Sequence, residues 1–425
     1  MTMKVAVVGG GSTYTPELVD GFARLREMLP IEELWLVDPD GSRLELVSGL
    51  SRRIFSRAGH PGQIRTTSSV EEGVSDADVV LLQLRIGGQA ARHGDETFPH
   101  EACCVGQETT GPGGFAKALR TVPVVLQIAE IIREKAKPNA WIIDFTNPVG
   151  IVTRALLQAG HRAVGLCNVA IGFQRRFAAL LDADFSKISL HHVGLNHLTW
   201  ELGVNLKTDG GSVNVLPRIL GEHLEEVARE VQLPPALLSL QQAVPSYYLR
   251  YFYVHDEVLR DQLSQPSRAQ AVMEVEDALL RKYADPALDI KPEELSLRGG
   301  AFYSEAAVDL MSSLISGRGD VQVVNIRNDG TLPFLPDDHV IEVPAVIQSG
   351  GMTVTPIGTL PEEIAGLISH VASYERLALD AALHGGRERV LKAMLAHPLV
   401  GQFDKAEKLT DALLAANREH LAWAR

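Results

Sequence analysis

The chain has 425 residues, with 40 Lys and Arg against 53 Asp and Glu, which gives a formal charge of −13 when His is neutral. This negative balance argues against nucleic acid as a partner. With 45% hydrophobic and 22% charged residues, the composition is that of a globular protein and excludes general disorder. The length allows roughly two or three domains.

The N-terminus and the cysteines predict a cytoplasmic protein. Residues 1–4 lead directly into a short apolar run, without the apolar core or cleavage site of a signal peptide. No segment approaches the ~20 apolar residues of a membrane span, so we expect no membrane partner. Cys103, Cys104 and Cys167 are an odd set in a large chain, which does not resemble a disulfide framework.

Short apolar runs alternate with stretches of helical period through the first half of the chain. The expected strands cover residues 5–8, 34–37, 79–84, 141–145, 164–166 and 188–193. The expected helices cover residues 16–28, 44–58 and 122–136. This alternation is typical of a parallel sheet with crossover helices. It predicts an α/β fold with a doubly wound, Rossmann-like N-terminal domain over residues 1–193.

The pattern changes after residue 193. Residues 199–213 predict a hairpin with its turn at Asp209-Gly210-Gly211, and residues 321–356 are Pro-rich and strand-like. Residues 406–423 predict a helix with leucines on one face, suited to internal packing or to an oligomer contact. We therefore expect a mixed α+β domain over residues 194–425 that binds substrate and supports a homo-oligomer.

Gly9-Gly10-Gly11-Ser12-Thr13 follows the first expected strand and opens the first helix. There the backbone can approach a pyrophosphate, and the helix N-terminus supplies positive potential. Asp38 ends the second expected strand, where an acidic residue accepts a hydrogen bond from the adenosine ribose and disfavours a 2′-phosphate. These features predict NAD rather than NADP. The alternative is a glycine-rich turn without a ligand.

Residues 106–114 form a stretch rich in glycine and hydroxyl residues before a long helix. Ligands bind beyond the carboxyl ends of strands in doubly wound sheets, so we interpret this stretch as an active-site loop. An ordinary Gly/Pro-rich loop is the alternative.

Cys167 and His197 each follow an expected strand. A thiolate and an imidazole at strand ends can share one metal ion and leave its other positions open to substrate oxygens. A buried apolar role is the alternative for the cysteine. His191 and His192 compete as ligands on spacing alone, but they lie within a strand-like run, which favours a packed or surface role.

Residues 245–253 contain four tyrosines. Such clustering is typical of an aromatic core, but a tyrosine beside a cation can also act as a general base. Arg85, Arg92 and Arg298 lie in loops near glycines and are candidates for anion binding, although most arginines are simply solvated.

Together and in this order, the motifs resemble those of glycoside hydrolase family four, the NAD- and divalent-metal-dependent glycosidases. The resemblance covers nearly the whole chain. The supporting motifs lie at residues 8–13, 85–88, 106–114, 144–148, 167–169, 194–197, 245–251 and 298–304.

The resemblance implies hydrolysis by redox-assisted elimination. NAD takes hydride from C3 of the sugar, the ketone acidifies the C2 proton, and a base removes that proton. The aglycone then leaves, water adds, and the hydride returns. A metal, Mn(II) or another divalent ion, would stabilise the enediolate as a Lewis acid.

The resemblance also assigns roles to residues. Cys167 and His197 match the metal ligands, and Tyr248 in a Pro-x-x-Tyr-Leu pattern matches the base, with Tyr247 as its neighbouring alternative. Arg92 and Asn147 match the substrate-contacting positions of the family, and Arg298 is a further candidate for such a contact.

The residue after the metal cysteine separates substrate classes within the family. Cys167-Asn168-Val169 resembles the 6-phospho-β-glucosidases, whereas members that act on α-glucosides have an aspartate acid at the second position. Asn168 cannot serve as such an acid and is expected to face the substrate. The sequence thus predicts a 6-phospho-β-glucosidase that forms a homodimer or homotetramer.

Three alternatives differ in activity. A family member acting on an unphosphorylated or differently configured glycoside would keep the same motifs. A plain NAD-dependent 2-hydroxy acid dehydrogenase would share the N-terminal half and release NADH. A non-catalytic NAD sensor would need neither metal nor base, and the presence of Cys167, His197 and Tyr248 disfavours it.

Overall fold

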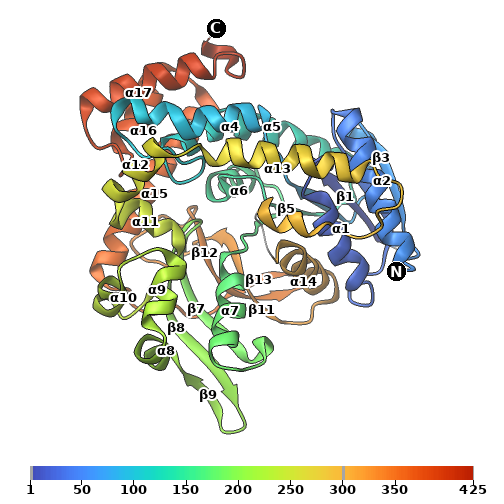
Figure 1. The fold of residues 1–425 in the computed structure, drawn as a ribbon, viewed down its shortest axis with the longest axis horizontal. Helices are drawn as coiled ribbons and strands as arrows, with labels where there is room; N and C mark the ends of the chain where they lie inside the picture. Colours follow the sequence, from blue (N-terminus) through green and yellow to red (C-terminus); the bar gives the residue numbers. More distant parts are fainter. Residues whose placement is uncertain (1–2, 299–301, 425) are drawn as a thin grey trace.

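The computed structural model describes residues 3–298 and 302–424. Residues 299–301, part of the motif that begins at Arg298, lie outside the described residues, as do residues 1–2 and 425. A single twisted sheet passes through the molecule, with helices on both of its faces (Figure 1). The strands follow the order β10-β8-β7-β12-β11-β6-β5-β4-β1-β2-β3, with β13 beside β12 and β9 beside β8.

The first half of the chain forms the parallel part of the sheet. Its strands are β1 (Met3–Val8), β2 (Ile31–Val37), β3 (Gln63–Thr67), β4 (Val79–Leu82), β5 (Trp141–Asp144) and β6 (Ala163–Gly165). The helices between them are α1 (Thr15–Arg24), α2 (Gly41–Arg57), α3 (Val70–Val74), α4 (Gly88–Thr97), α5 (Pro112–Lys135), α6 (Val149–Gln158) and α7 (Val169–Leu180). The order 3-2-1-4-5-6 is that of a Rossmann sheet, so the predicted doubly wound fold is confirmed.

The helices α3, α4, α6 and α7 were not among the expected ones, and β3 and α5 also differ from the sequence prediction. β3 was not predicted, because its sequence is mostly polar and only Ile64 is buried at this edge of the sheet. α5 begins at Pro112, ten residues before the expected start at residue 122. A Cβ at Gly113 would lie 2.1 Å from the Asp95 carbonyl oxygen, and one at Gly114 would lie 2.1 Å from the Thr109 carbonyl oxygen. The last residues of the predicted loop therefore form a closely packed first turn of α5.

The second half extends the same sheet with antiparallel strands. These are β7 (Ile188–Leu195), β8 (Leu198–Thr208), β9 (Gly211–Asn214), β10 (Val244–Pro245), β11 (Val321–Arg327), β12 (Val340–Gln348) and β13 (Gly351–Val354). The predicted hairpin turn joins β8 to β9, where Thr208 pairs with Gly211. Asn325 of β11 pairs with Gly165 of β6, which makes the sheet continuous across the two halves. The boundary predicted after residue 193 falls inside β7 and stays a prediction.

Helices of the second half cover the sheet and part of the first half. They are α8 (Leu216–Glu222), α9 (Leu224–Val231), α10 (Pro235–Gln241), α11 (Arg250–Tyr253), α12 (His255–Ser264), α13 (Arg268–Tyr283), α14 (Tyr303–Ser316), α15 (Glu362–His384), α16 (Arg387–Ala396) and α17 (Phe403–Ala416). α13 contacts α2 and α4, so a helix of the second half lies across the first (Figure 1).

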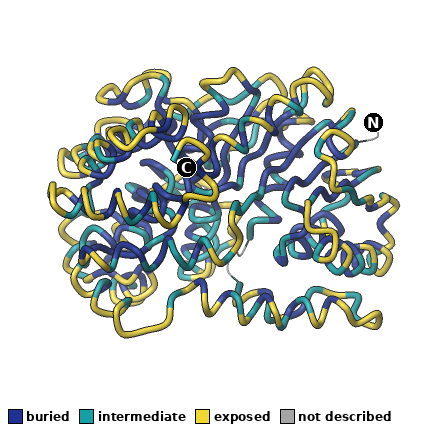
Figure 2. Tube along the Cα trace, turned by 90° about the horizontal axis from the view of Figure 1, so that it is seen from above, coloured by how far each residue is buried: buried dark blue, intermediate teal, exposed yellow. Residues whose placement is uncertain are grey.

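The interior is continuous through both halves of the molecule, as the buried segments at its centre show (Figure 2). The predicted C-terminal helix is present as α17, which ends at Ala416, seven residues before the predicted end at residue 423. Its Leu409 and Leu413 are fully buried in the same chain. Its apolar face is therefore used for internal packing. Within residues 3–298 and 302–424, no helix combines the length and apolar character needed to cross a membrane.

Candidate active site

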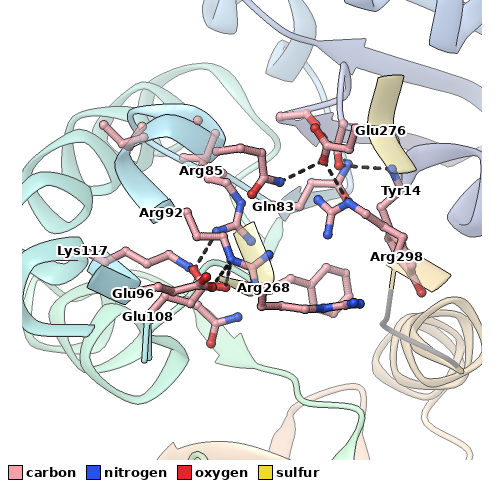
Figure 3. A pocket seen from close by; sticks show the side chains of 18 of the residues that line it. Tyr14, Gln83, Arg85, Arg92, Glu96, Glu108, Lys117, Arg268, Glu276 and Arg298 are labelled. Atoms are coloured by element: carbon pink, nitrogen blue, oxygen red, sulfur yellow. Dashed lines mark hydrogen bonds and ion pairs between the residues drawn. The ribbon is translucent and has the colours of Figure 1, made fainter. Parts of the chain in front are cut away.

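A cavity of about 1510 Å³ lies at the carboxyl ends of the parallel strands, beneath α13. The glycine-rich loop and Asp38 line one end, and His197 and Tyr248 line the other. Basic side chains also line the cavity, namely Arg85, Arg92, Lys117, Arg268 and Arg298 (Figure 3). The cavity thus brings together the predicted cofactor loop, the basic residues and His197, whereas Cys167 is buried and is not among the described residues that line it.

The glycine-rich loop after β1 has no room for side chains. Gly9 has φ +92°, and a Cβ there would lie 2.6 Å from the carbonyl oxygen of Gln83. At Gly10 and Gly11, an added Cβ would meet Leu36 at 2.8 Å and Asp38 at 2.7 Å. The bare backbone of the loop therefore lies against β2 and borders the cavity, as close approach of a pyrophosphate requires.

Asp38 is held by backbone groups at the end of β2. Its Oδ2 accepts from Gly11 N–H at 2.9 Å, and its Oδ1 accepts from Asp40 N–H at 3.0 Å. An ionised carboxylate offers about four acceptor sites, so both oxygens keep capacity for a ribose hydroxyl. Ser12 also lines the cavity, whereas Thr13 is buried beneath it.

Glu276 of α13 reaches the glycine-rich loop from above. Its Oε1 accepts from Arg298 Nε at 2.9 Å, Gln89 Nε2 at 2.9 Å and Thr13 Oγ1 at 3.2 Å. Its Oε2 lies 3.4 Å from Arg43 Nη2. Burial alone would raise the pKa of Glu276, but Arg298 and Arg43 hold it below its usual value. Arg298, predicted as a substrate contact, thus lies beside the dinucleotide loop (Figure 3).

Cys167 and His197 are joined through Asn196. Cys167 follows β6, is buried, and lies beside the side chain of Asn196; burial raises the pKa of its thiol. Asn196 Nδ2 donates to Glu342 Oε2 at 2.8 Å. His197 comes next in the chain, with φ +62°, so both predicted ligands adjoin the half-buried Asn196.

The hydrogen bonds around Thr109 determine the tautomer of His197. Gln107 Oε1 accepts from the backbone N–H of Thr109 and of Thr110, which identifies it as the amide oxygen. Thr109 Oγ1 must then donate its single proton to Gln107 Oε1, at 2.9 Å. It can therefore only accept from His197 Nδ1–H, at 3.0 Å. This leaves the lone pair of His197 on Nε2.

Tyr248 rather than Tyr247 lies against His197. The Tyr248 and His197 rings stack with centroids 3.8 Å apart and an interplanar angle of 13°. Tyr247 packs edge-on against Tyr248 and lies under the guanidinium of Arg250. Burial raises the pKa of Tyr248 well above its usual value. The phenol of Tyr248 therefore stays protonated unless a cation lies near it.

Three cations surround Glu108 in the middle of the cavity. Its Oε2 lies 2.6 Å from Arg85 Nη1 and 2.5 Å from Lys117 Nζ, and its Oε1 lies 3.2 Å from Arg92 Nε. Burial would raise the pKa of Glu108, but these cations lower it well below the usual value. Arg92 also pairs with Glu96 at 2.7 Å. The Glu108 cluster, defined by these five residues, keeps a formal charge of +1 when all of them are ionised.

Sequence reasoning missed Lys117, although a signal was present. Lys117 is a lone charge within the apolar stretch of residues 115–119, and it is 2% exposed. Burial lowers its pKa to about 7, against the opposing effect of Glu108. Arg268, which also lines the cavity and donates to the Leu297 carbonyl at 2.6 Å, was missed as well. Nothing in its local sequence distinguishes it from a solvated arginine.

The predicted substrate residues Asn147 and Asn168 both line the cavity. Asn147 Oδ1 is buried and has no hydrogen-bond partner among the described residues, as expected of a group that awaits a ligand. His192 instead lies buried between Glu201 and Glu342, at 2.6 and 3.0 Å. His191 Nε2 lies 2.7 Å from the Ile357 carbonyl, so both histidines have the packed roles that the sequence favoured.

The donors at Cys167 and His197 fit a divalent ion completed by substrate oxygens. Burial lowers the pKa of His197 to about 4, so its imidazole is neutral at pH 7 and Nε2 can bind a metal. Within residues 3–298 and 302–424, no group of three or more His, Cys, Asp or Glu side chains is arranged to hold a metal ion. A site with two protein ligands leaves positions open, as a catalytic metal requires.

Comparison with protein families gives two adjoining matches. A model described as "Family 4 glycosyl hydrolase" matches residues 4–183. A model described as "Family 4 glycosyl hydrolase C-terminal domain" matches residues 192–400. Together they cover most of the chain.

Individual relatives are similar over their full lengths. A "Probable 6-phospho-beta-glucosidase" of Bacillus subtilis is 40% identical over 99% of this chain and 97% of its own. The 6-phospho-beta glucosidase of Thermotoga maritima, solved with NAD and glucose-6-phosphate, superposes with a TM-score of 0.92 at 34% identity, covering 99% of each chain. A second form of that protein, with manganese, NAD+ and glucose-6-phosphate, gives a TM-score of 0.90 at 33% identity, covering 98% of this chain and 99% of that one.

Proposed function

This chain belongs to family 4 of the glycosyl hydrolases, and from this we propose that it hydrolyses 6-phospho-β-glucosides to glucose 6-phosphate and an aglycone, using NAD and a divalent metal. The observation that supports this most is a single cavity that joins a dinucleotide loop to an imidazole and a tyrosine, with the buried thiol of Cys167 near that tyrosine. A plain 2-hydroxy acid dehydrogenase would need the dinucleotide loop and a His–Asp pair, but neither the thiol nor the tyrosine.

We propose that the loop of Gly9, Gly10, Gly11 and Ser12 receives the dinucleotide phosphates, supported by the buried Thr13 beneath it, and that Asp38 binds the adenosine ribose. Cys167 and His197 would hold Mn(II) or another divalent ion. When bound, the dinucleotide accepts and returns a hydride, while the ion polarises the sugar oxygens and favours the phenolate of the nearby tyrosine.

Tyr248 is the proposed base that removes the C2 proton. It stacks on His197, which places its ring beside the proposed metal ligands, and it lies close enough to Cys167 for the two charges to interact. Asn147 would bind a sugar hydroxyl through its unpaired Oδ1. Asn168, at the start of α7, cannot donate a proton as an acid, so the aglycone must leave without one from this position.

Basic residues of the cavity suit a phosphorylated sugar. The Glu108 cluster, to which Arg92 belongs, has a formal charge of +1 when all of its residues are ionised. Arg268 is exposed on the cavity wall, and among the described residues it donates to the Leu297 carbonyl rather than to a carboxylate. We propose that Arg92 contacts the sugar and that Arg268 adds positive potential for the 6-phosphate, whereas Arg298 is paired with Glu276 beside the dinucleotide loop.

Hydrolysis of an aryl β-glucoside 6-phosphate in D₂O, with NAD+ and Mn(II), tests this function. We expect deuterium at C2 of the released glucose 6-phosphate, read by NMR, and no net NADH. Tyr248→Phe should slow the exchange, with Tyr247→Phe as the matched control. Sugar released without deuterium would contradict the proposed elimination, and equal turnover of the unphosphorylated glucoside would contradict the substrate.

We also propose that the protein works in the cytoplasm as a homodimer or homotetramer, with residues 1–193 binding the dinucleotide and residues 194–425 completing the substrate site. The absence of an apolar spanning helix among the described residues is consistent with this location. Sedimentation of the purified chain tests the oligomeric state, and a monomer at micromolar concentration would contradict it.

A further inference from the structure

Glu276 is a buried carboxylate that the proposed reaction does not use. Its side chain is 7% exposed, and it belongs to α13, far along the chain from the loop that it contacts. Its partners are Thr13, Gln89, Arg298 and Arg43. A negative charge at this point is unexpected, because the loop and the N-terminus of α1 are suited to anionic phosphates.

The position of Glu276 is fixed because α13 is anchored at both ends. At its start, Ala269 N–H donates to Glu96 Oε2 at 2.7 Å. At its end, Tyr283 Oη donates to the Thr13 carbonyl at 2.7 Å, and Arg53 Nη2 donates to the Tyr283 carbonyl at 2.8 Å. Glu276 is thus held above the dinucleotide loop by contacts to both α2 and α4.

Arg43 is the partner of Glu276 nearest to the expected ribose. It lies in the first turn of α2, five residues after Asp38, and lines the cavity with Asp38 and Asp40. In doubly wound folds, an arginine near the acidic residue accommodates the 2′-phosphate of NADP. Here its Nε donates to the Gly11 carbonyl at 3.3 Å, and its Nη2 lies 3.4 Å from Glu276 Oε2.

We infer that Glu276 is a specificity-determining residue that selects NAD over NADP by occupying and neutralising Arg43. Asp38 disfavours a 2′-phosphate by direct repulsion, and Glu276 neutralises Arg43, whose positive charge would otherwise offset that repulsion. A 2′-phosphate would have to displace a carboxylate that three further donors hold in place. This inference rests on the proposed dinucleotide site.

Calorimetric titration of the full-length protein with NAD+ and with NADP+ tests it, because binding is measured without turnover. The variants are Glu276→Gln, Arg43→Ala and the double variant. Asp277→Asn is the matched control, since it removes an exposed carboxylate from the next position of the same helix.

In Glu276→Gln, we expect the ratio of the NADP+ to the NAD+ dissociation constant to fall by about tenfold, because Arg43 becomes free to make one charge-assisted contact with the 2′-phosphate. The ratio should not change in Asp277→Asn. It should also not change when Glu276→Gln is added to Arg43→Ala. The inference would be overturned if Glu276→Gln left this ratio unchanged, including the case in which it strengthened the binding of both dinucleotides equally. It would also be overturned if Glu276→Gln lowered the ratio equally in the Arg43→Ala background.

Arg43→Ala alone provides a second test should Glu276→Gln fail to fold. If Glu276 already occupies Arg43, this variant should bind NADP+ as weakly as the wild type does. A further tenfold loss of NADP+ affinity would mean that Arg43 is free to bind the phosphate, and would refute the inference. Failure of the wild type to bind NAD+ would instead refute the proposed function.

Discussion

Replacement of Thr109 by Val should weaken metal binding without altering either proposed ligand. The Thr109 hydroxyl is the acceptor for His197 Nδ1–H at 3.0 Å, and it is fixed in that role by its own bond to Gln107. Valine has nearly the same shape as threonine but cannot accept a hydrogen bond. The imidazole then loses the contact that keeps its lone pair on Nε2 and its ring in place.

The size of the effect follows from these contacts. A buried N–H left without an acceptor costs about 1–3 kcal/mol. Loss of an outer partner of a metal-binding histidine typically lowers metal affinity about 10- to 100-fold, which corresponds to about 1.4–2.7 kcal/mol. Because burial lowers the pKa of His197 to about 4, competition between protons and the metal at this imidazole adds nothing to the effect at pH 7.

The assay is titration of metal-free protein with Mn(II), with free Mn(II) measured by electron paramagnetic resonance. Thr110→Val is the matched control, because Thr110 Oγ1 is buried without a hydrogen-bond partner among the described residues. We expect the control to bind Mn(II) like the wild type. Unchanged affinity in Thr109→Val, or an equal loss in the control, would refute the tautomer argument.

Three other residues give separate predictions. Burial would lower the pKa of His192, but Glu201 and Glu342 raise it to about 10. The contribution of the charged His192 imidazole to the stability of the fold is therefore complete below about pH 6.5 and is lost as the pH rises toward 10. His192→Leu should cost about 3–5 kcal/mol in urea unfolding at pH 7, and a loss below about 1 kcal/mol would contradict an ionic network. Asp38→Ala should weaken NAD+ binding about tenfold in calorimetry, whereas unchanged affinity would mean that another group holds the ribose. Asn147→Ala should lower kcat/KM about tenfold or more while leaving the melting temperature within a few degrees, and unchanged kcat/KM would exclude a substrate contact.

The sequence determined most of the parallel half of the fold and most of the proposed site residues. Apart from the edge strand β3, the strands of that half are largely buried and read as short apolar runs. The glycines after β1 are required by contacts with β2 and Gln83 that leave no space for a side chain. Cys167, His197 and Tyr248 could be named because each lies in a short local motif.

Only the tertiary structure decided how these residues are joined. Glu276 reaches Thr13 across 263 positions of the chain, and His197 reaches Thr109 across 88. Such contacts depend on where helices pack and leave no periodic signal in the sequence. The same holds for the Glu108 cluster, because whether a lysine or an arginine is solvated or paired depends on burial, and burial is set by the whole fold.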